Sequence, residues 1–446
     1  MHVDLQRSFV DAFRSFAPYI NAHRGQAFVI QFGGEMIANA AFTEFVHDLV
    51  LLDALAIQLV LVPGAKSQID ARLHAEKLQS KFVDSRRITD ARTMEIVKEV
   101  TGALRVEIEA RLSMGLANSP TAGARISVRS GNFVTARPIG VQSGQDFLYT
   151  GEVRRVDTIG LRQSLDAHNI VLLSPIGYSP TGEAFNVAAE DVATAVATEL
   201  NAAKLLLLSS AHGLEDSNGD KVRELTTEQA GQLLALHLRD AQRSCLHSTR
   251  LLAAAVRACR NGVKRTHILD ARISGAVLLE AFTRDGVGTM VSADTYDITR
   301  SAVIDDVPGI LELIEPLEAD GILVRRSRDK LEQEISRFTV MERDGAVLAC
   351  AALYPYADTQ FMELACLAVA PQYRSGERGD ALLAQLERTA LAAGATTLFV
   401  LTTRTAHWFA ERGFIEGRVD DLPIEKQALY NLQRSSKVLL KPLSRP

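Results

Sequence analysis

The stretch FVIQFGGEMI (residues 28–37) decides the expected fold of the first part of the chain. Its apolar start leads into the paired glycines Gly33 and Gly34, as a buried strand does when it enters a phosphate-binding turn. Where such a turn serves phosphoryl transfer, a lysine usually stands just before the glycines, but Gln31 stands there here. The chain keeps the glycine turn of an anion site and lacks its cation.

Apolar runs and helical segments alternate outward from this stretch, from about residue 25 to 290. The runs that favour strands are AFVIQF (27–32), IQLVLV (57–62), NIVLLSPIG (169–177), AKLLLLSS (203–210) and RTHILD (265–270). Because charge rarely interrupts them, they suit strands buried on both faces of a mostly parallel sheet. Residues 188–202 and 248–262 favour helices, and SGNFVTARPIG (130–140) with YTGEVRRVD (149–157) favours an antiparallel excursion. The predicted fold is an α/β sandwich.

The N-terminal segment favours an amphipathic helix. Its apolar residues Leu5, Phe9, Phe13, Phe16 and Ile20 recur every three or four positions. The aromatic stripe packs either on its own domain or on another subunit, and both interpretations stay open.

A second unit of α+β type follows a polar joint near residue 295. Residues 298–317 favour a short strand, an acidic turn and a helix, and residues 338–356 favour a hairpin that turns at Asp344 and Gly345. Further strands are expected at 360–371 and 396–403, with a helix between them. We therefore expect an N-terminal helix at 1–22, a sandwich domain at 23–292 and a smaller domain at 293–446.

Composition limits the classes of function. The chain has 446 residues, 47% of them hydrophobic, and a net charge of −5, which gives no hint of nucleic-acid binding. The cysteines Cys245, Cys259, Cys350 and Cys366 form no metal-binding spacing, so no metal is expected. Charges scattered through the first residues exclude a signal peptide, and no apolar run could span a membrane. We expect a cytoplasmic protein.

An Arg/Gly-rich turn follows the strand MELACLAVAP (362–371). It contains Arg374, Ser375, Gly376, Arg378, Gly379 and Asp380 and runs directly into a helix. Glycines let the backbone approach a phosphate, and the free N–H groups of a helix start point at its oxygens. The turn is either an anion site or an ordinary loop-to-helix cap.

Two polar residues on strands are candidates for proton transfer. Alternation along the strand places Glu363 on one face with Ala365, Leu367 and Val369, where a lone carboxylate suits a base for an ammonium nucleophile. It could also be a solvated residue at the strand end. Thr402 ends the next strand and either hydrogen-bonds a leaving thiolate or is a simple β-former.

Basic residues surround these positions. Arg325, Arg326 and Arg328 precede them in sequence, and Arg434, Ser436 and Lys437 follow them. Two guanidiniums from distant segments could each hold one carboxylate in bidentate fashion, or the residues could form a solvated charged face.

The first domain resembles the amino-acid kinase family, and acetylglutamate kinase within it, over roughly residues 25–291. The resemblance rests on the glycine turn, on LVLVPGAKSQID (59–70), on Asn186 before a helix and on Lys204 ahead of a buried strand. Gln31 replaces the first lysine, Glu190 replaces an aspartate, and the segment of a second lysine has no counterpart. The resemblance therefore implies a binding or assembly module without kinase activity.

The Arg/Gly turn and HWFAERGF (407–414) resemble the GCN5-related N-acetyltransferases. A degenerate kinase fold joined to such a domain resembles the family of bacterial N-acetylglutamate synthases over essentially the whole chain. This resemblance implies acetyl transfer from acetyl-CoA to the α-amino group of L-glutamate, feedback inhibition by L-arginine, and a ring-shaped homo-oligomer, a hexamer, linked by the N-terminal helices.

The resemblance also implies roles for individual residues. Glu363 corresponds to a general base that works through water, and Thr402 to the Ser or Thr acid. Arg326, Arg434 and Ser436 fall where the carboxylates of glutamate are held. The backbone of Cys366, Leu367 and Val369 pairs with the pantetheine arm of acetyl-CoA, and the turn from Arg374 to Asp380 binds its pyrophosphate. The implied arginine site comprises Lys204, His267, Glu280, Gly286 and Gly288, with Glu280 pairing with the guanidinium.

Three other interpretations remain. The chain could be a non-catalytic arginine sensor, an acetyltransferase for another amino acid such as aspartate or ornithine, or a residual kinase that works without either lysine.

Overall fold

The computed structural model describes residues 2–39, 41–83, 85–115, 117–210, 214, 221–240, 247–293, 297–343, 345–356, 360–374, 378–428, 430 and 436–443. The chain divides into two compact units, Met1–Asp294 and Thr295–Pro446. Three residues predicted to bind ligands, Ser375, Gly376 and Arg434, lie outside the described residues, as does the expected turn residue Asp344.

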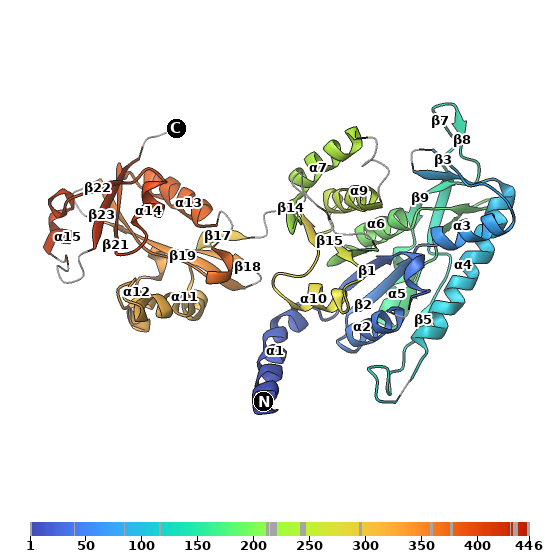
Figure 1. Cartoon of the computed structure of the whole chain (residues 1–446), viewed down its shortest axis with the longest axis horizontal. Coiled ribbons are helices and arrows are strands. Elements are labelled where there is room, and N and C mark those ends of the chain that lie inside the picture. The colour runs from blue at the N-terminus through green and yellow to red at the C-terminus, as the bar shows by residue number, and fades with distance from the viewer. Residues whose placement is uncertain are drawn as a thin grey trace. The chain divides into compact units, whose positions relative to one another are not determined.

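The first unit is built on an eight-stranded sheet with the order β14-β16-β15-β13-β1-β2-β10-β5 (Figure 1). All neighbours in it are parallel except β15 and β16. Its strands are β1 (Ala27–Phe32), β2 (Gln58–Pro63), β5 (Val128–Arg129), β10 (Ile170–Leu172), β13 (Lys204–Ser209), β14 (Glu224–Thr226), β15 (Arg265–Asp270) and β16 (Thr289–Ser292). The predicted mostly parallel sheet is confirmed.

Helices cover both faces of this sheet. They are α1 (His2–His23), η1 (Gly34–Met36), α2 (Phe42–Ala54), α3 (Lys66–Ala75), α4 (Ala91–Leu112), α5 (Thr158–Asp166), α6 (Ala189–Leu200), α7 (Thr227–Arg239), α9 (His247–Arg260) and α10 (Ala276–Phe282). Val29 of β1 packs in a cluster with residues of α5, α6 and α9. Its neighbours Phe28 and Ile30 pack in the opposite cluster with residues of α2, α4 and α10. Because successive side chains point to opposite faces, one apolar strand supplies both layers of an α/β sandwich.

A smaller sheet of order β12-β11-β6-β9 forms the expected antiparallel excursion. Its strands are β6 (Val134–Pro138), β9 (Gly151–Val156), β11 (Ile176–Tyr178) and β12 (Ala184–Asn186), and short hairpins join β3 (Lys81–Val83) to β4 (Arg86–Ile88) and β7 (Val141–Gln142) to β8 (Gln145–Asp146). The prediction of one strand over 169–177 is wrong. The chain turns at Ser174 and Pro175, because Pro175 has no N–H to continue a ladder, and β10 and β11 belong to different sheets.

The N-terminal helix α1 packs on its own domain with only part of its aromatic stripe. Phe16 and Ile20 pack against the core of the unit, and His23 Nε2 lies 2.9 Å from the carbonyl oxygen of Ala281 on α10. Phe9 and Phe13, by contrast, are 68% and 58% exposed. The outer half of the stripe is left uncovered by its own chain.

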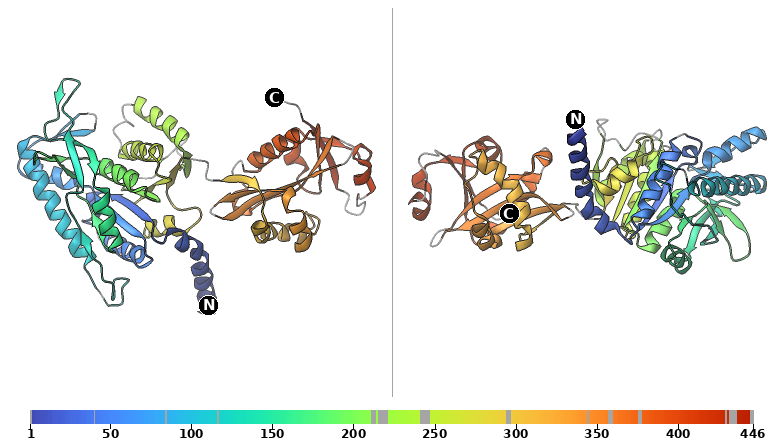
Figure 2. Two further views of the ribbon diagram at one scale, coloured as in Figure 1. Left: turned by 180° about the vertical axis from the view of Figure 1, so that it is seen from behind. Right: turned by 90° about the horizontal axis from the view of Figure 1, so that it is seen from below.

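The second unit contains a seven-stranded sheet of order β17-β18-β19-β20-β21-β23-β22. Its strands are β17 (Ile298–Ser301), β18 (Phe338–Arg343), β19 (Ala346–Pro355), β20 (Phe361–Val369), β21 (Thr397–Thr402), β22 (Ile415–Gly417) and β23 (Lys437–Pro442). Helices α11 (Val307–Ala319) and α12 (Arg328–Gln333) cover one face, and α13 (Arg378–Ala392) and α14 (Ala406–Ala410) cover the other (Figure 2). Short elements η2 (Ile304–Asp306), η3 (Ile335–Arg337), η4 (Pro371–Tyr373), η5 (Val419–Asp421) and α15 (Ile424–Ala428) complete the unit.

Strand β20 does not alternate regularly, which corrects one prediction. Two residues, Cys366 and Leu367, face the single residue Ala351 of β19, and Cys366 has a φ of 55°. This bulge reverses the alternation, so that Leu367 packs on the same side as Leu364. We expected Glu363 to share a face with Leu367 and Val369. Because of the bulge, it shares a face with Cys366 instead.

Candidate functional site

Strands β20 and β21 separate in the middle of the second sheet. Their parallel pairing covers only Phe361 to Glu363, although β20 continues to Val369 and β21 to Thr402. Beyond Glu363, β21 pairs with β23 alone, and Thr402 lies opposite Lys437. The parting leaves one edge of β20 free for backbone hydrogen bonds to an extended ligand. Cys366, Leu367 and Val369 all lie on this part of the strand.

Glu363 lies at the point where the strands part. Its side chain is buried, but its surroundings are not the apolar ones expected from the strand, because both carboxylate oxygens are 2.7 Å from the Nζ of Lys426. The hydroxyl of Tyr356 donates to Oε2 at 2.8 Å. Burial and the nearby Glu363 carboxylate raise the pKa of Tyr356, so this phenol stays protonated as a donor.

Thr402 and Ser436 lie at the ends of neighbouring strands on the other side of the opening. Thr402 is buried, and its hydroxyl oxygen accepts the N–H of Thr405 at 3.0 Å and lies 2.8 Å from the Thr405 hydroxyl. Ser436 precedes β23 and is also buried, and its carbonyl oxygen accepts the Tyr430 hydroxyl at 2.6 Å. When the Thr405 hydroxyl and N–H both donate to the Thr402 oxygen, the Thr402 hydroxyl can still donate its own proton to another acceptor.

Arg326 approaches the opening from the segment between α11 and α12. Its backbone N–H donates to Glu318 at 2.9 Å, and its Nη1 donates to the Val324 carbonyl at 3.2 Å. Its Nε is buried without a hydrogen-bond partner in the described part of the chain. Burial raises the pKa of the Cys366 thiol to about 11, so this thiol stays protonated. The positive charge of Arg326 acts on the thiol in the opposite direction, so the guanidinium lies within electrostatic range of Cys366.

The two described ends of the Arg/Gly turn are held by one ion pair and one hydrogen bond to the backbone, which sequence reasoning did not identify. Arg374 Nε donates to the carbonyl of Val369 at 3.1 Å. Arg378 Nε donates to Asp297 at 2.6 Å, and its guanidinium lies 5.2 Å from the ring centroid of Tyr373. These contacts attach the turn to the start of the unit.

The first turn of α13 is anchored by α14 and the residues that follow it. Asp380 forms an ion pair with Arg412, which lowers the pKa of that carboxyl, and Arg412 stacks 3.9 Å from the ring centroid of Trp408. A Cβ on Gly379 would lie 3.0 Å from Trp408. Gly379 thus lets the helix start pack closely on the indole, and Asp380 holds it there.

The residues expected to bind an effector do lie together in the first unit. The buried Glu280 of α10 lies 2.5 Å from His267 Nδ1 of β15. Its Oε2 accepts the N–H of Val287 at 2.7 Å and of Gly288 at 2.9 Å. Lys204 Nζ lies 3.4 Å from the carbonyl oxygen of Glu280.

Charge in this cluster is set by burial and hydrogen bonding. Burial opposes ionisation of Glu280, but the bonds from His267 and from two backbone N–H groups lower its pKa to about 2. Burial and the Lys204 ammonium lower the pKa of His267 to about 4. At neutral pH, therefore, the cluster contains an ionised Glu280 and a neutral His267. The Nε2 of His267 is buried without a partner among the described residues.

A cavity of about 410 Å³ in the first unit contains the glycine turn at Gly33 and Gly34. Gly33, Gly34 and Gly64 line it together with the starts of α3 and α6, and no side chain caps either helix. Gln31, in the place of the usual lysine, lines the cavity with its buried Oε1 unpaired in the described structure. The cradle for an anion is thus present, and its first cation is replaced by a neutral amide.

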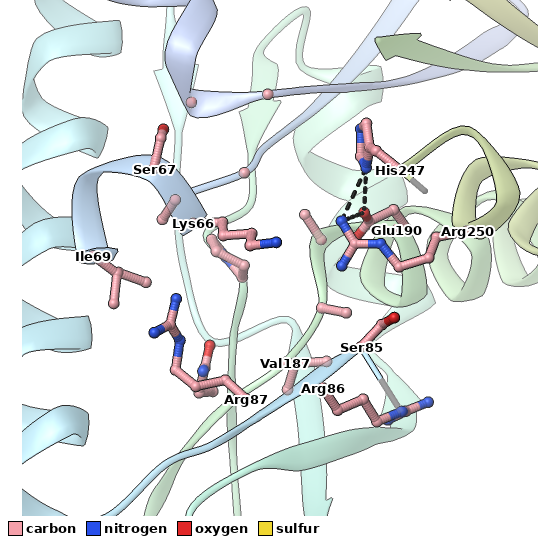
Figure 3. A pocket seen from close by; sticks show the side chains of 18 of the residues that line it. Lys66, Ser67, Ile69, Ser85, Arg86, Arg87, Val187, Glu190, His247 and Arg250 are labelled. Atoms are coloured by element: carbon pink, nitrogen blue, oxygen red, sulfur yellow. Dashed lines mark hydrogen bonds and ion pairs between the residues drawn. The ribbon is translucent and has the colours of Figure 1, made fainter. Parts of the chain in front are cut away.

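Some of the other charged residues of this cavity are paired with one another. Figure 3 shows Glu190 beside His247 and Arg250, at 3.6 and 3.4 Å. Burial lowers the pKa of His247 despite this neighbour. Arg87 pairs with Asp70 at 2.7 Å. The position of the kinase aspartate is therefore filled by a glutamate that already has a cationic partner, Arg250.

Sequence reasoning missed Lys426, Tyr356, Tyr430, Trp408 and Arg412. Trp408 and Arg412 belong to the segment HWFAERGF (407–414), so the residue types of that segment could have indicated them. Lys426 and Tyr430 belong to a segment whose pattern gives no signal. The described residues contain neither a helix suited to cross a membrane nor a cluster of three or more His, Cys, Asp or Glu side chains arranged for a metal.

Comparisons with known proteins agree with this geometry. Residues 26–270 match the amino acid kinase family, and residues 309–414 match the acetyltransferase (GNAT) family. The amino-acid acetyltransferase of Azotobacter vinelandii is 54% identical over 437 residues, which cover 98% of this chain and 100% of that protein. That of Pseudomonas fluorescens is 53% identical over 98% of this chain and 99% of its own length.

A similar solved structure has the same two-part organisation. N-acetylglutamate synthase from Neisseria gonorrhoeae, complexed with coenzyme A and L-arginine, is 37% identical with a TM-score of 0.86, over 98% of this chain and 100% of that one. The chain therefore belongs to the amino-acid acetyltransferase family, the N-acetylglutamate synthases, in which an amino acid kinase fold precedes a GNAT acetyltransferase fold.

Proposed function

We propose that this enzyme transfers the acetyl group of acetyl-CoA to the α-amino group of L-glutamate, as the first step of L-arginine biosynthesis, and that L-arginine inhibits it through the first unit. One observation carries the catalytic part. Glu363 lies where β20 and β21 part, Thr402 and Ser436 lie at the adjoining ends of β21 and β23, and the charge of Arg326 acts on Cys366 of β20. This opening is where a base, a hydroxyl donor and a guanidinium could act on one acceptor.

Glu363 is the general base of this proposal. It accepts a proton from the ammonium group of glutamate, and the amine then attacks the carbonyl carbon of the thioester. The resemblance implies that a water molecule carries this proton, and the Lys426 ammonium at 2.7 Å illustrates that an amine can also contact the carboxylate directly. Thr402 donates a hydrogen bond to the departing thiolate, because Thr405 supplies the donor that leaves the Thr402 proton free.

The acceptor and the cofactor are held by different parts of the unit. Arg326, whose Nε has no partner in the described structure, and Arg434 each bind one carboxylate of glutamate, with Ser436 as a further donor. The free edge of β20 at Cys366, Leu367 and Val369 binds the pantetheine arm. The start of α13 binds the pyrophosphate, with Arg374, Ser375, Gly376, Arg378 and Gly379 around it and Asp380 as its anchor. An Arg326→Ala variant should raise the KM for glutamate by about tenfold or more.

The first unit, residues 23–292, is the regulatory domain in this proposal. Glu280 pairs with the guanidinium of L-arginine through the lone pair left on Oε1, beside His267, Lys204 and the backbone at Gly286 and Gly288. The N-terminal helix, residues 1–22, joins copies of the chain into a homo-oligomer, a hexamer by resemblance, through the exposed Phe9 and Phe13. The related structure complexed with coenzyme A and L-arginine supports the choice of both ligands.

The test is thiol release from acetyl-CoA with L-glutamate as acceptor, with and without L-arginine. Glutamate-dependent release that arginine suppresses supports the whole proposal. Release that is insensitive to arginine removes the regulatory assignment. A thermal shift with arginine but no release with glutamate, aspartate or ornithine would instead favour a sensor.

A further inference from the structure

Lys426 is the closest partner of the proposed base. Its Nζ lies 2.7 Å from each oxygen of Glu363, and its side chain is only 18% exposed. It comes from the five-residue helix α15, far along the chain from β20. The other paired lysines of this unit lie elsewhere: Lys437, 56% exposed, pairs with Glu416, and Lys441 pairs with Glu387.

The position of this ammonium is the one that the reaction requires of an acceptor. A base must lie within hydrogen-bond reach of the proton that it removes, about 2.6–3.2 Å between heavy atoms. Lys426 meets this condition at both oxygens of Glu363 and does so beside the opening between β20 and β21. With Lys426 on both oxygens and Tyr356 on Oε2, about one acceptor site is left, on Oε1, so a second ammonium cannot contact both oxygens as Lys426 does.

We infer that Lys426 occupies, in the free enzyme, the place of the acceptor amine, and that its Nζ is a site of self-acetylation by acetyl-CoA. The inference rests on the proposed roles of Glu363 and acetyl-CoA. It adds a second acceptor, a lysine of the chain itself, to the proposed amino-acid substrate.

The step balances without any further reactant. Glu363 takes one proton from the Lys426 ammonium, and the lone pair released on Nζ attacks the carbonyl carbon of the thioester. The C–N bond forms, the C–S bond breaks, and coenzyme A leaves as a thiolate that takes a proton from solvent. The second proton of the attacking nitrogen is lost to solvent, and the product is a neutral acetyl-lysine.

Acetylation of Lys426 has a consequence for the enzyme. The neutral amide cannot form the ion pair with Glu363, and its added acetyl group fills the amine position. L-glutamate and Lys426 therefore compete for Glu363: glutamate protects the lysine, and modification of the lysine slows turnover of glutamate.

The experiment incubates the full-length enzyme with acetyl-CoA carrying a deuterated acetyl group, without L-glutamate, and measures labelled lysines by peptide mass spectrometry. The deuterium separates new acetyl groups from any present after expression. Since Lys426 is held against a base, we expect its label to exceed that of Lys437 by about tenfold or more, although Lys437 is more exposed. Saturating L-glutamate should remove most of the Lys426 label and leave the Lys437 label unchanged.

A Glu363→Gln variant provides the matched control. It keeps the size of the side chain and removes the base, so label at Lys426 should fall to the level at Lys437. Thiol release with glutamate is measured on the same wild-type sample. Turnover of glutamate without excess label at Lys426, or label that Glu363→Gln does not reduce, overturns this inference alone. Absence of both turnover and label overturns the proposed function and this inference with it.

Discussion

Each unit of the molecule buries one critical glutamate, and the two are held by opposite means. Glu280 in the first unit is fixed by two backbone N–H groups and an imidazole, whereas Glu363 in the second is held by a lysine ammonium and a phenol. Backbone donors cannot move without local unfolding. A lysine side chain can turn away by rotation about its own bonds.

In the proposed function, this difference would separate a carboxylate that binds a ligand from one that takes part in the reaction. Glu280 receives fixed donors that favour its ionised form, so it is suited to hold a cationic ligand without changing its charge. Glu363 has a partner that an incoming ammonium can replace, so it is suited to take up a proton in one step and lose it in another. The following predictions test whether the two carboxylates differ in this way.

The largest effect is expected for Glu363→Gln, measured as kcat with saturating acetyl-CoA and L-glutamate. Loss of a general base typically costs about 100-fold or more in rate. Tyr356→Phe is the matched control, because it removes one hydrogen bond to Glu363 and leaves the carboxylate in place. It should reduce kcat by about tenfold at most. A fall of only a few-fold in Glu363→Gln would remove Glu363 from the role of base.

A smaller effect is expected for Glu280→Gln, measured as the L-arginine concentration that halves the variant's own uninhibited rate. The neutral amide loses the charge that would pair with a guanidinium, so this concentration should rise by about 30-fold, the equivalent of about 2 kcal/mol. If the half-inhibiting concentration is unchanged, arginine binds elsewhere, and Glu280 is not the carboxylate that holds it.

A still smaller effect is expected for Gly286→Ala. Gly286 has a φ of 56°, and a Cβ there would lie 2.4 Å from Glu280 Oε2. Gly182→Ala is the matched control, because its φ is 89° but nothing lies within 4 Å of its Cβ. Both variants incur backbone strain of about 1 kcal/mol, and only Gly286→Ala should also weaken inhibition by arginine. Equal inhibition curves for the two variants would show that the position of Glu280 does not depend on this contact.

The sequence predicted the framework of both units because its signals there are local. The leucine-rich run at 205–209 is buried on both faces of a sheet, as an uncharged apolar run suggests. The Arg/Gly turn and its helix also follow from residue types at fixed spacing. The effector residues Lys204, His267 and Glu280 came only through a family resemblance, although the structure does bring them together.

The features that the sequence did not predict depend on tertiary contacts. The bulge at Cys366 leaves no mark on the alternation of apolar residues, because Cys, Leu, Ala and Val suit either face of a strand. The pairing of Lys426 with Glu363 joins residues far apart in sequence through a helix too short for a periodic signal. Partners of this kind are chosen by packing, so composition and spacing cannot identify them.

The smallest effect concerns pH and the neighbour of Glu280. The pKa of His267, about 4 in the folded chain, is below its ordinary value of 6.5, so the unfolded chain binds a proton first. Stability of the first unit should therefore fall as pH decreases from about 6.5 towards 4. Glu280, with a pKa of about 2 against an ordinary 4.5, contributes stability that is full above pH 4.5 and is lost as pH falls towards 2.

His267→Gln keeps a donor for Glu280 and removes the titrating ring. The midpoint of thermal unfolding should therefore change by several degrees less between pH 7 and pH 5 than it does in the unmodified chain. Parallel curves for the two proteins would show that His267 is not buried in its neutral form, and Glu280 would then be held, like Glu363, by a cation.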